Sequence, residues 1–294
     1  MGDSEVEAIT DADATLGESP VWDGVRQRML WVDIDAGDVH TFDPRTRHRT
    51  RRRYGAPLGF VRLADDGRLV LGRGGNVYLA GSSTSELVAG VEADRRENRL
   101  NDSAIDAAGR LWAGTMRRDA TGAEGALYRL EWNDGTPTVR RMLDSVGISN
   151  GIGWSLDQAS MYYIDTATHR VDQIDFDLVT GVLGNRRPFI QTEAARPDGM
   201  TVDREGWLWV AFPSHGQVRR YSPTGKLDGV IEFPVRRVTS CCFGGAELDE
   251  LYVTSARDQN VPPGAAAAGG SVYRCRPGKQ GQPANRFTTS RFLP

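Results

Sequence analysis

The sequence predicts an all-β fold, a six-bladed β-propeller in which four-stranded antiparallel blades surround a central channel. Three observations support this prediction. A short segment, in which a Leu or Met is followed by aromatic or aliphatic β-forming residues, occurs six times, each time after a turn rich in Asp or Gly. The copies are evenly spaced, and a second run of alternating residues follows each of them.

The spacing of the six copies matches the length of a propeller blade. The steps between successive copies are 39, 42, 50, 47 and 43 residues, measured between Leu30, Leu69, Leu111, Met161, Leu208 and Leu251. A four-stranded blade takes about 40 to 50 residues. Because six such blades use the whole chain of 294 residues, we expect residues 1–294 to form a single domain.

The alternating runs predict a further strand in every blade, since a period of two residues is typical of half-buried antiparallel strands. They cover residues 39–43, 77–79, 126–130, 171–177, 218–222 and 271–275. The arginine-rich run from Arg45 to Arg53 is interpreted as a solvated loop. We expect the C-terminal residues 286–294 to return to blade one or blade six and close the ring.

Composition narrows the classes of partner. A net charge of -3 argues against nucleic acid and against a membrane surface, and no apolar stretch is long enough to cross a membrane. The acidic N-terminal segment does not resemble a secretory signal, so we expect a cytoplasmic protein. We also expect it to be a monomer or a weak homodimer. Three cysteines, two of them adjacent, are interpreted as small core residues and not as a disulfide framework.

Four of the six blades carry an oxygen-bearing side chain where the first strand opens. Glu18, Asn101, Asn150 and Asp198 stand ten to twelve residues before the mark of their blade, whereas Leu58 and Thr239 hold these places in blades two and six. The innermost strands of a propeller converge on its axis. We therefore expect the four polar side chains to face one another around one mouth of the channel.

Two carboxylates and two amides that converge in this way would repel one another or lack hydrogen-bond partners. A bound cation would satisfy their oxygen atoms. All the candidate ligands are oxygens, which favours calcium first, then magnesium or manganese, with zinc less favoured. An alternative stays open, because Asn150-Gly151 and Asp198-Gly199 are also common turn dipeptides and Glu18 could lie in a surface loop. The shared position in the repeat favours a common site.

Several motifs resemble the regucalcin/gluconolactonase family, also called senescence-marker-protein-like. They are Gly17-Glu18-Ser19-Pro20-Val21-Trp22, Leu30-Trp31-Val32-Asp33-Ile34, Asn98-Arg99-Leu100-Asn101-Asp102, Ala113-Gly114-Thr115-Met116, Gly125-Ala126-Leu127-Tyr128, Ser149-Asn150-Gly151, Pro197-Asp198-Gly199-Met200 and Thr239-Ser240-Cys241-Cys242-Phe243-Gly244-Gly245. They follow in the family's order from about residue 16 to residue 274. The resemblance implies a six-bladed propeller, one divalent cation in the central cavity, and hydrolysis of sugar lactones.

The resemblance also assigns roles to individual residues. Glu18, Asn150 and Asp198 match the family's metal ligands. Arg99 and Asn101 match residues that hold the sugar. The family's substrate-loop glutamate falls on Thr121 here, and the nearest acid is Glu124, which we take as a further candidate for substrate binding.

The predicted function is therefore metal-dependent hydrolysis of a sugar lactone, with Asp198 as a metal ligand that also accepts a proton from water. Two alternatives remain: another metal-dependent hydrolase, such as an organophosphate phosphotriesterase, and a non-enzymatic calcium-binding regulatory protein. A Ser/His/Asp mechanism is disfavoured, since the sequence has no Gly-x-Ser-x-Gly motif. We expect His169 to face solvent and His215 to lie on the face opposite the channel mouth.

Overall fold

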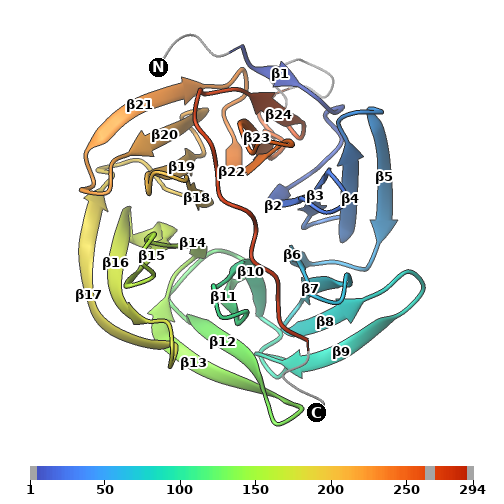
Figure 1. Cartoon of the computed structure of the whole chain (residues 1–294), viewed down its shortest axis with the longest axis vertical. Coiled ribbons are helices and arrows are strands. Elements are labelled where there is room, and N and C mark those ends of the chain that lie inside the picture. The colour runs from blue at the N-terminus through green and yellow to red at the C-terminus, as the bar shows by residue number, and fades with distance from the viewer. Residues whose placement is uncertain (1–4, 262–268, 290–294) are drawn as a thin grey trace.

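The computed structural model describes residues 5–261 and 269–289. Within them, six sheets of four antiparallel strands each surround a central channel (Figure 1), which confirms the predicted propeller. The helical structure in these ranges is one 3-10 turn, Thr166–Thr168. No helix in this part of the chain is long and apolar enough to cross a membrane.

Each of the first five blades is built from four consecutive strands, ordered from the channel outward. In blades one to three the strands are β2 (Gly17–Asp23), β3 (Arg28–Asp33), β4 (Asp38–Asp43) and β5 (His48–Arg53), then β6 (Leu58–Leu63), β7 (Leu69–Arg73), β8 (Asn76–Ala80) and β9 (Ser85–Gly90), then β10 (Asn98–Ile105), β11 (Leu111–Arg117), β12 (Gly125–Asn133) and β13 (Thr136–Val146). In blades four and five they are β14 (Ser149–Trp154), β15 (Ser160–Asp165), β16 (Arg170–Asp177) and β17 (Val182–Gln191), then β18 (Met200–Val202), β19 (Leu208–Phe212), β20 (Gln217–Tyr221) and β21 (Leu227–Glu232).

The sixth blade closes the ring with a strand from the other end of the chain. It contains β22 (Val238–Gly244), β23 (Glu250–Ser255) and β24 (Val272–Cys275), and its outer strand is the N-terminal β1 (Glu7–Ala8). β1 pairs with β24 in antiparallel register, with Glu7 opposite Arg274. The ring is thus closed by the N-terminal strand, and the prediction that residues 286–294 close it is wrong, although residues 290–294 lie outside the described residues.

The described part of the C-terminal tail, residues 276–289, instead crosses the middle of the ring (Figure 1). The Gly281 amide donates to the Leu248 carbonyl of blade six, and the Phe287 amide donates to the Leu63 carbonyl of blade two. Phe287 is fully buried in the core between blades two and three. The tail is therefore a strap that ties together blades which are not neighbours in the chain.

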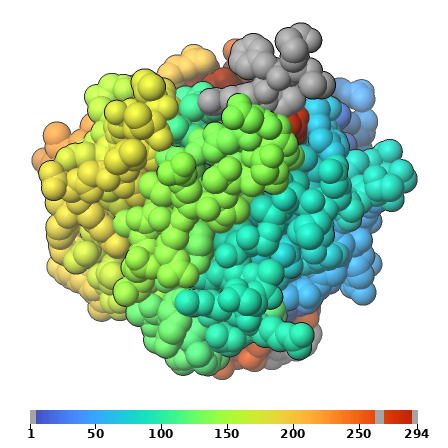
Figure 2. Space-filling view, turned by 90° about the horizontal axis from the view of Figure 1, so that it is seen from below, coloured from blue at the N-terminus to red at the C-terminus, as the bar shows by residue number. Residues whose placement is uncertain are grey.

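The apolar core of the described residues divides into clusters that lie between neighbouring blades. Trp209 of blade five packs edge to face on Phe243 of blade six, and Trp22 of blade one stacks on Tyr252 of blade six. The aromatic residues that marked the repeat fill these interfaces, and Trp31 is almost completely buried. Figure 2 shows blades two, three and four side by side on one flank of the molecule.

The outermost strands differ from the inner ones because one side of each faces solvent. β5 contains most of the arginine-rich run that the sequence analysis interpreted as a loop, so that interpretation is wrong. Its residues pair with β4 along its whole length, while Arg51 and Arg53 form ion pairs with Asp38. Charged residues on an exposed edge strand also protect it from pairing with other chains.

Candidate active site

The innermost strands begin at the same end of the channel, which we call the entrance mouth. In five of the six blades the pairing of the innermost strand shifts close to this start, between Glu18 and Val21 in β2 and at equivalent places in β6, β10, β14 and β22. Asn101 and Asn150 lie within two of these shifts. A bulge of this kind changes the direction of a side chain, which allows residues of a regular strand to point into the channel.

Hydrogen bonds between blades hold the entrance mouth together. The Gly151 amide donates to the Asp198 carbonyl at 3.2 Å, and the Gly199 amide donates to the Thr239 carbonyl at 2.8 Å. The Thr239 hydroxyl in turn donates to the Gly17 carbonyl at 2.6 Å. Blades four, five, six and one are thereby joined in sequence, so the candidate residues are carried on rigid backbone.

The two amides are oriented by a chain of hydrogen bonds. Asn101 Nδ2 donates to Asn150 Oδ1 at 2.8 Å, and Asn150 Nδ2 donates to the Thr166 hydroxyl at 2.7 Å. Thr166 donates to the Pro197 carbonyl at 2.6 Å, and Arg99 donates to Asn101 Oδ1 at 2.5 Å. These contacts fix both amide planes and leave Asn150 Oδ1 with an unused lone pair.

The two carboxylates have few partners. Glu18 is 8% exposed and accepts one hydrogen bond, from the Ser19 amide, while the half-buried carboxylate of Asp198 accepts none from the described residues. Neither forms an ion pair within that part of the chain. Burial, reinforced by the negative charges of Asp198 and Asp102, raises the pKa of Glu18 well above its usual range. Burial and the charge of Asp102 raise the pKa of Asp198 to about 8.

The donor set fits a hard divalent cation. Both carboxylates have a raised pKa and neither forms an ion pair with the described residues, so a bound cation would stabilise their charged forms. Within residues 5–261 and 269–289 no three His, Cys, Asp or Glu side chains are grouped to hold a metal. A third protein ligand would therefore be an amide oxygen, which Asn150 Oδ1 offers. Glu18, Asn150 and Asp198 are the residues that would hold the ion.

Comparison with known proteins agrees with the motifs. The model of the family described as SMP-30/Gluconolactonase/LRE-like region matches residues 16–257, which include all four polar residues of the entrance mouth. The chain belongs to this family. Human regucalcin is 39% identical over 274 residues, which cover 90% of this chain and 91% of that protein.

Two solved structures show how closely the fold follows the family. A luciferin-regenerating enzyme, 32% identical, superposes with a TM-score of 0.90 over 97% of this chain and 99% of its own. A calcium-binding protein, regucalcin, from Agrobacterium tumefaciens, 24% identical, superposes with a TM-score of 0.89 over 97% of both chains. The names of these SMP-30/gluconolactonase relatives describe more than one activity, so the site must decide the function.

One buried ion pair below the entrance mouth was not predicted. Asp102, next to Asn101, is 6% exposed and accepts a hydrogen bond from Arg62 at 3.1 Å. Arg62 also donates to the Ser19 hydroxyl at 2.6 Å and to the Ser103 carbonyl. Burial raises the pKa of Asp102 and Arg62 opposes the rise. The pair connects the innermost strands of blades one, two and three across the channel.

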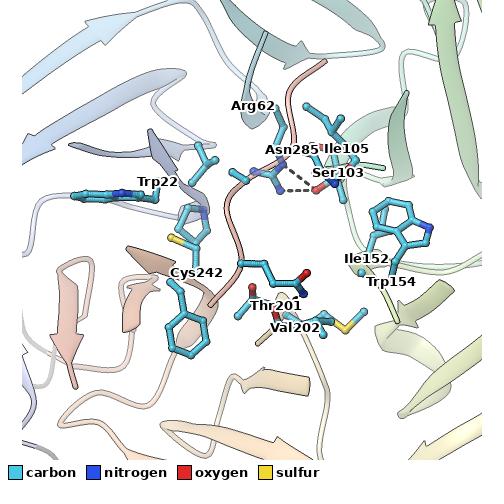
Figure 3. Close-up of a pocket in the computed structure, with 18 of the residues that line it drawn as sticks. Trp22, Arg62, Ser103, Ile105, Ile152, Trp154, Thr201, Val202, Cys242 and Asn285 are labelled. Atoms are coloured by element: carbon cyan, nitrogen blue, oxygen red, sulfur yellow. Dashed lines mark hydrogen bonds between the residues drawn. The ribbon is translucent and has the colours of Figure 1, made fainter. Parts of the chain in front are cut away.

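A cavity of about 410 Å³ occupies the other end of the channel. The C-terminal tail crosses it (Figure 3), with Gln282 donating to the Val202 carbonyl at 3.2 Å and Asn285 donating to the Ile105 carbonyl at 2.9 Å. The tail therefore covers the end of the channel opposite the entrance mouth, and this leaves the entrance mouth as the approach to the four polar residues.

The three cysteines are free thiols, in agreement with the sequence analysis. Cys241 and Cys275 are buried in the core, whereas Cys242 lines the cavity (Figure 3). Burial raises the pKa of Cys242 to about 12. Its thiol stays protonated at neutral pH and is a weak nucleophile.

Glu124 lies on the loop that joins β11 and β12, at the face of the entrance mouth. Its side chain is exposed, and its carbonyl accepts a hydrogen bond from Asn98 at 3.1 Å. Arg99 is half-buried beside Asn101. The structure thus places both candidates for substrate binding on the expected face, and their roles stay predictions.

The histidines differ from their predicted positions. His215 follows β19, which ends at the entrance face, and the adjacent Gly216 amide donates to the Arg236 carbonyl, so the prediction of the opposite face is wrong. Its side chain is exposed. His169 is half-buried, with Nδ1 3.3 Å from the Ala195 carbonyl, and does not simply face solvent. Strand direction alone could have placed both residues on this face.

Proposed function

We propose that this protein hydrolyses a sugar lactone to the open-chain acid with the help of a divalent cation held by Glu18, Asn150 and Asp198. The observation that carries the proposal is the pair of carboxylates, Glu18 and Asp198, which have raised pKa values and form no ion pair with the described residues at the entrance mouth of a propeller from the SMP-30/gluconolactonase family. Calcium suits this all-oxygen donor set best, followed by magnesium or manganese and then zinc.

Lactone hydrolysis needs water to attack the ring carbonyl carbon, after which the bond to the ring oxygen breaks. A divalent cation, when bound, would polarise the carbonyl and stabilise the negative charge that develops on its oxygen. Asp198 has a carboxylate free of other hydrogen bonds and accepts the proton of the attacking water. That proton passes to the ring oxygen, which leaves as a hydroxyl group, and the new carboxylic acid ionises.

The remaining candidates hold the reacting groups in place. Both N–H groups of the Asn101 amide donate, to Asn150 Oδ1 and to the Ser149 carbonyl, and its oxygen accepts from Arg99. We therefore assign Asn101 to positioning Asn150, in addition to any contact with sugar. Arg99 keeps unused guanidinium N–H groups for the substrate, and exposed Glu124 would contact a sugar hydroxyl from the rim.

The test is hydrolysis of a panel of neutral aldonolactones, followed by proton release. The protein is stripped with a chelator and then supplied with calcium, manganese, magnesium or zinc. We expect activity to vanish on stripping and to return with at least one ion. If no lactone is hydrolysed with any ion, the proposal fails, and turnover of a phosphotriester or tight calcium binding without hydrolysis would identify which alternative replaces it.

A further inference from the structure

Three arginines at the entrance mouth have no carboxylate partner. Arg196 precedes Pro197 and Asp198, is exposed, and makes no hydrogen bond or ion pair with the described residues. Arg237, two residues before Thr239, is half-buried and donates one hydrogen bond, to the Arg257 carbonyl at 2.7 Å. Arg99 is half-buried too, and it donates hydrogen bonds to the Leu100 carbonyl and to the amide oxygen of Asn101.

These arginines contrast with buried arginines elsewhere in the fold. Arg62, Arg110, Arg129 and Arg220 each contact a carboxylate at 3.1 Å or less. A desolvated guanidinium without a counter-charge is costly. Burial accordingly lowers the pKa of Arg99. Arg99 therefore keeps a buried positive charge with no carboxylate in ion-pair contact among the described residues, unlike these four arginines.

The three guanidinium groups lie near the proposed ligands and are not balanced by other acids. The positive charges of Arg237, Arg196 and Arg99 all act on Asp198. A divalent cation would neutralise Glu18 and Asp198, which leaves these three charges in excess.

The nearest other carboxylates do not remove this excess. Asp35 acts on Arg99, but Arg118 lies on the same side with a positive charge. Asp258 acts with Arg236 and Arg237 without forming an ion pair with either. Asp35 and Asp258 are thus each matched by a further arginine at the rim, and exposed Glu124 can offset only one of the three charges, so the local charge stays positive.

From this arrangement we propose that the substrate is an anionic sugar lactone, one that carries a carboxylate or a phosphate in addition to the ring ester. This inference rests on the proposed lactone hydrolysis and names the substrate class of the same site. Arginine binds both kinds of oxyanion with paired N–H groups, and Arg196 and Arg237 have such groups to spare. The hydrolysis adds one water, breaks the ring ester bond and gives a product with one more negative charge than the substrate.

The test compares three lactones with the full-length, metal-loaded protein: gluconolactone, which is neutral, glucarolactone, which carries a carboxylate, and 6-phosphogluconolactone. We expect at least one anionic lactone to exceed the neutral one in kcat/KM by about tenfold or more, with a preference that shrinks as salt is added. The two anionic substrates distinguish the carboxylate from the phosphate.

Two variants locate the effect. Arg196→Gln and Arg237→Gln should each reduce the ratio of kcat/KM for the anionic lactone to that for the neutral lactone by about tenfold, chiefly through KM. Arg140→Gln is the matched control. Arg140 is exposed on the outer strand β13, so this substitution removes the same charge at a position far from the mouth. It should leave the ratio unchanged.

The outcomes separate this inference from the proposed function. Metal-dependent hydrolysis of neutral lactones with no preference for anionic ones, or a ratio unaffected by both variants, would overturn the inference and leave the lactonase standing. If no lactone is hydrolysed, calorimetric titration of the metal-loaded protein with glucarate and gluconate still decides. Tighter binding of glucarate that both variants abolish supports the anionic site, and equal binding overturns it.

Discussion

At the end of the channel opposite the entrance mouth, Asp106 and Asp203 follow the innermost strands of blades three and five. Asp106 accepts hydrogen bonds from Trp112 Nε1 at 2.9 Å and from Arg110 Nε at 2.7 Å. Asp203 repeats this arrangement with Trp209 Nε1 at 2.9 Å and with Arg220. At the entrance mouth, Asp198 precedes the innermost strand of blade five and has no such partners.

This difference in hydrogen-bond partners separates carboxylates that stabilise the fold from carboxylates that are available to bind a ligand. Fully bonded Asp106 and Asp203 cap the turns of their own blades. Glu18 and Asp198 repel each other instead, and a bound cation would offset the free-energy cost of this repulsion. Both ends carry acidic residues, but Asp106 and Asp203 are fully buried with several hydrogen-bond partners, whereas Asp198 is half-buried with none among the described residues.

The largest effect should come from Asp198. We expect Asp198→Asn to lower kcat/KM for lactone hydrolysis by about a thousandfold or more. The substitution removes one carboxylate that is proposed both to bind the metal and to accept the proton. Steady-state rates at saturating metal measure this. Near-normal activity in a folded Asp198→Asn protein would show that the unpaired carboxylate has no part in the reaction.

The opposite pattern should hold at the far end. Asp106→Ala leaves Arg110 buried without its carboxylate and should lower the free energy of unfolding by about 3 to 5 kcal/mol. Urea denaturation followed by circular dichroism measures the change. We expect the folded fraction to keep its kcat, and a loss of kcat without loss of stability would erase the distinction between the two ends.

The sequence predicted the strands that carry several buried aromatic and aliphatic residues, and missed those that do not. The second and third strands of the blades, such as β3 and β4, carry buried aromatic and aliphatic residues at regular intervals. The outer strand β5 is exposed along most of its length, and β1 has two residues. Such strands are defined by their neighbours in the sheet, so no local pattern shows them.

The candidate ligands could be predicted because the repeat places them at one position of successive blades. Asn101 and Asn150 were expected to meet, and they share a hydrogen bond. Arg62 and Asp102 were missed as a pair because they are 40 residues apart and neither alone differs from a surface residue. The unpaired state of Arg196 is likewise visible only when every neighbouring carboxylate has been placed.

A smaller effect should follow from Asn101, which links the two kinds of residue at the entrance mouth. We expect Asn101→Ala to raise the metal concentration needed for half-maximal activity by about 10- to 100-fold, because Asn150 loses the donor that orients its oxygen. KM for the lactone should rise as well. Asn133→Ala, on an exposed hairpin, is the control. An unchanged metal requirement would remove Asn101 from the positioning role.

The smallest effect is a dependence of the free energy of unfolding on pH that arises from Asp198 at the entrance mouth. In metal-free protein, Asp198 holds its proton up to about pH 8 in the folded state, whereas the unfolded chain releases it near pH 4. Between these values the folded state binds more protons, so the stability that protonation provides is lost as pH rises, by at most about 1.4 kcal/mol per pH unit.

Asp198→Asn should remove this part of the slope when urea unfolding is measured with chelator at pH 5 and pH 8, and calcium should restore wild-type stability at pH 8. Parallel pH profiles for the two proteins would mean that Asp198 ionises as freely in the fold as in water, and the contrast with Asp106 and Asp203 would then rest on hydrogen bonds alone.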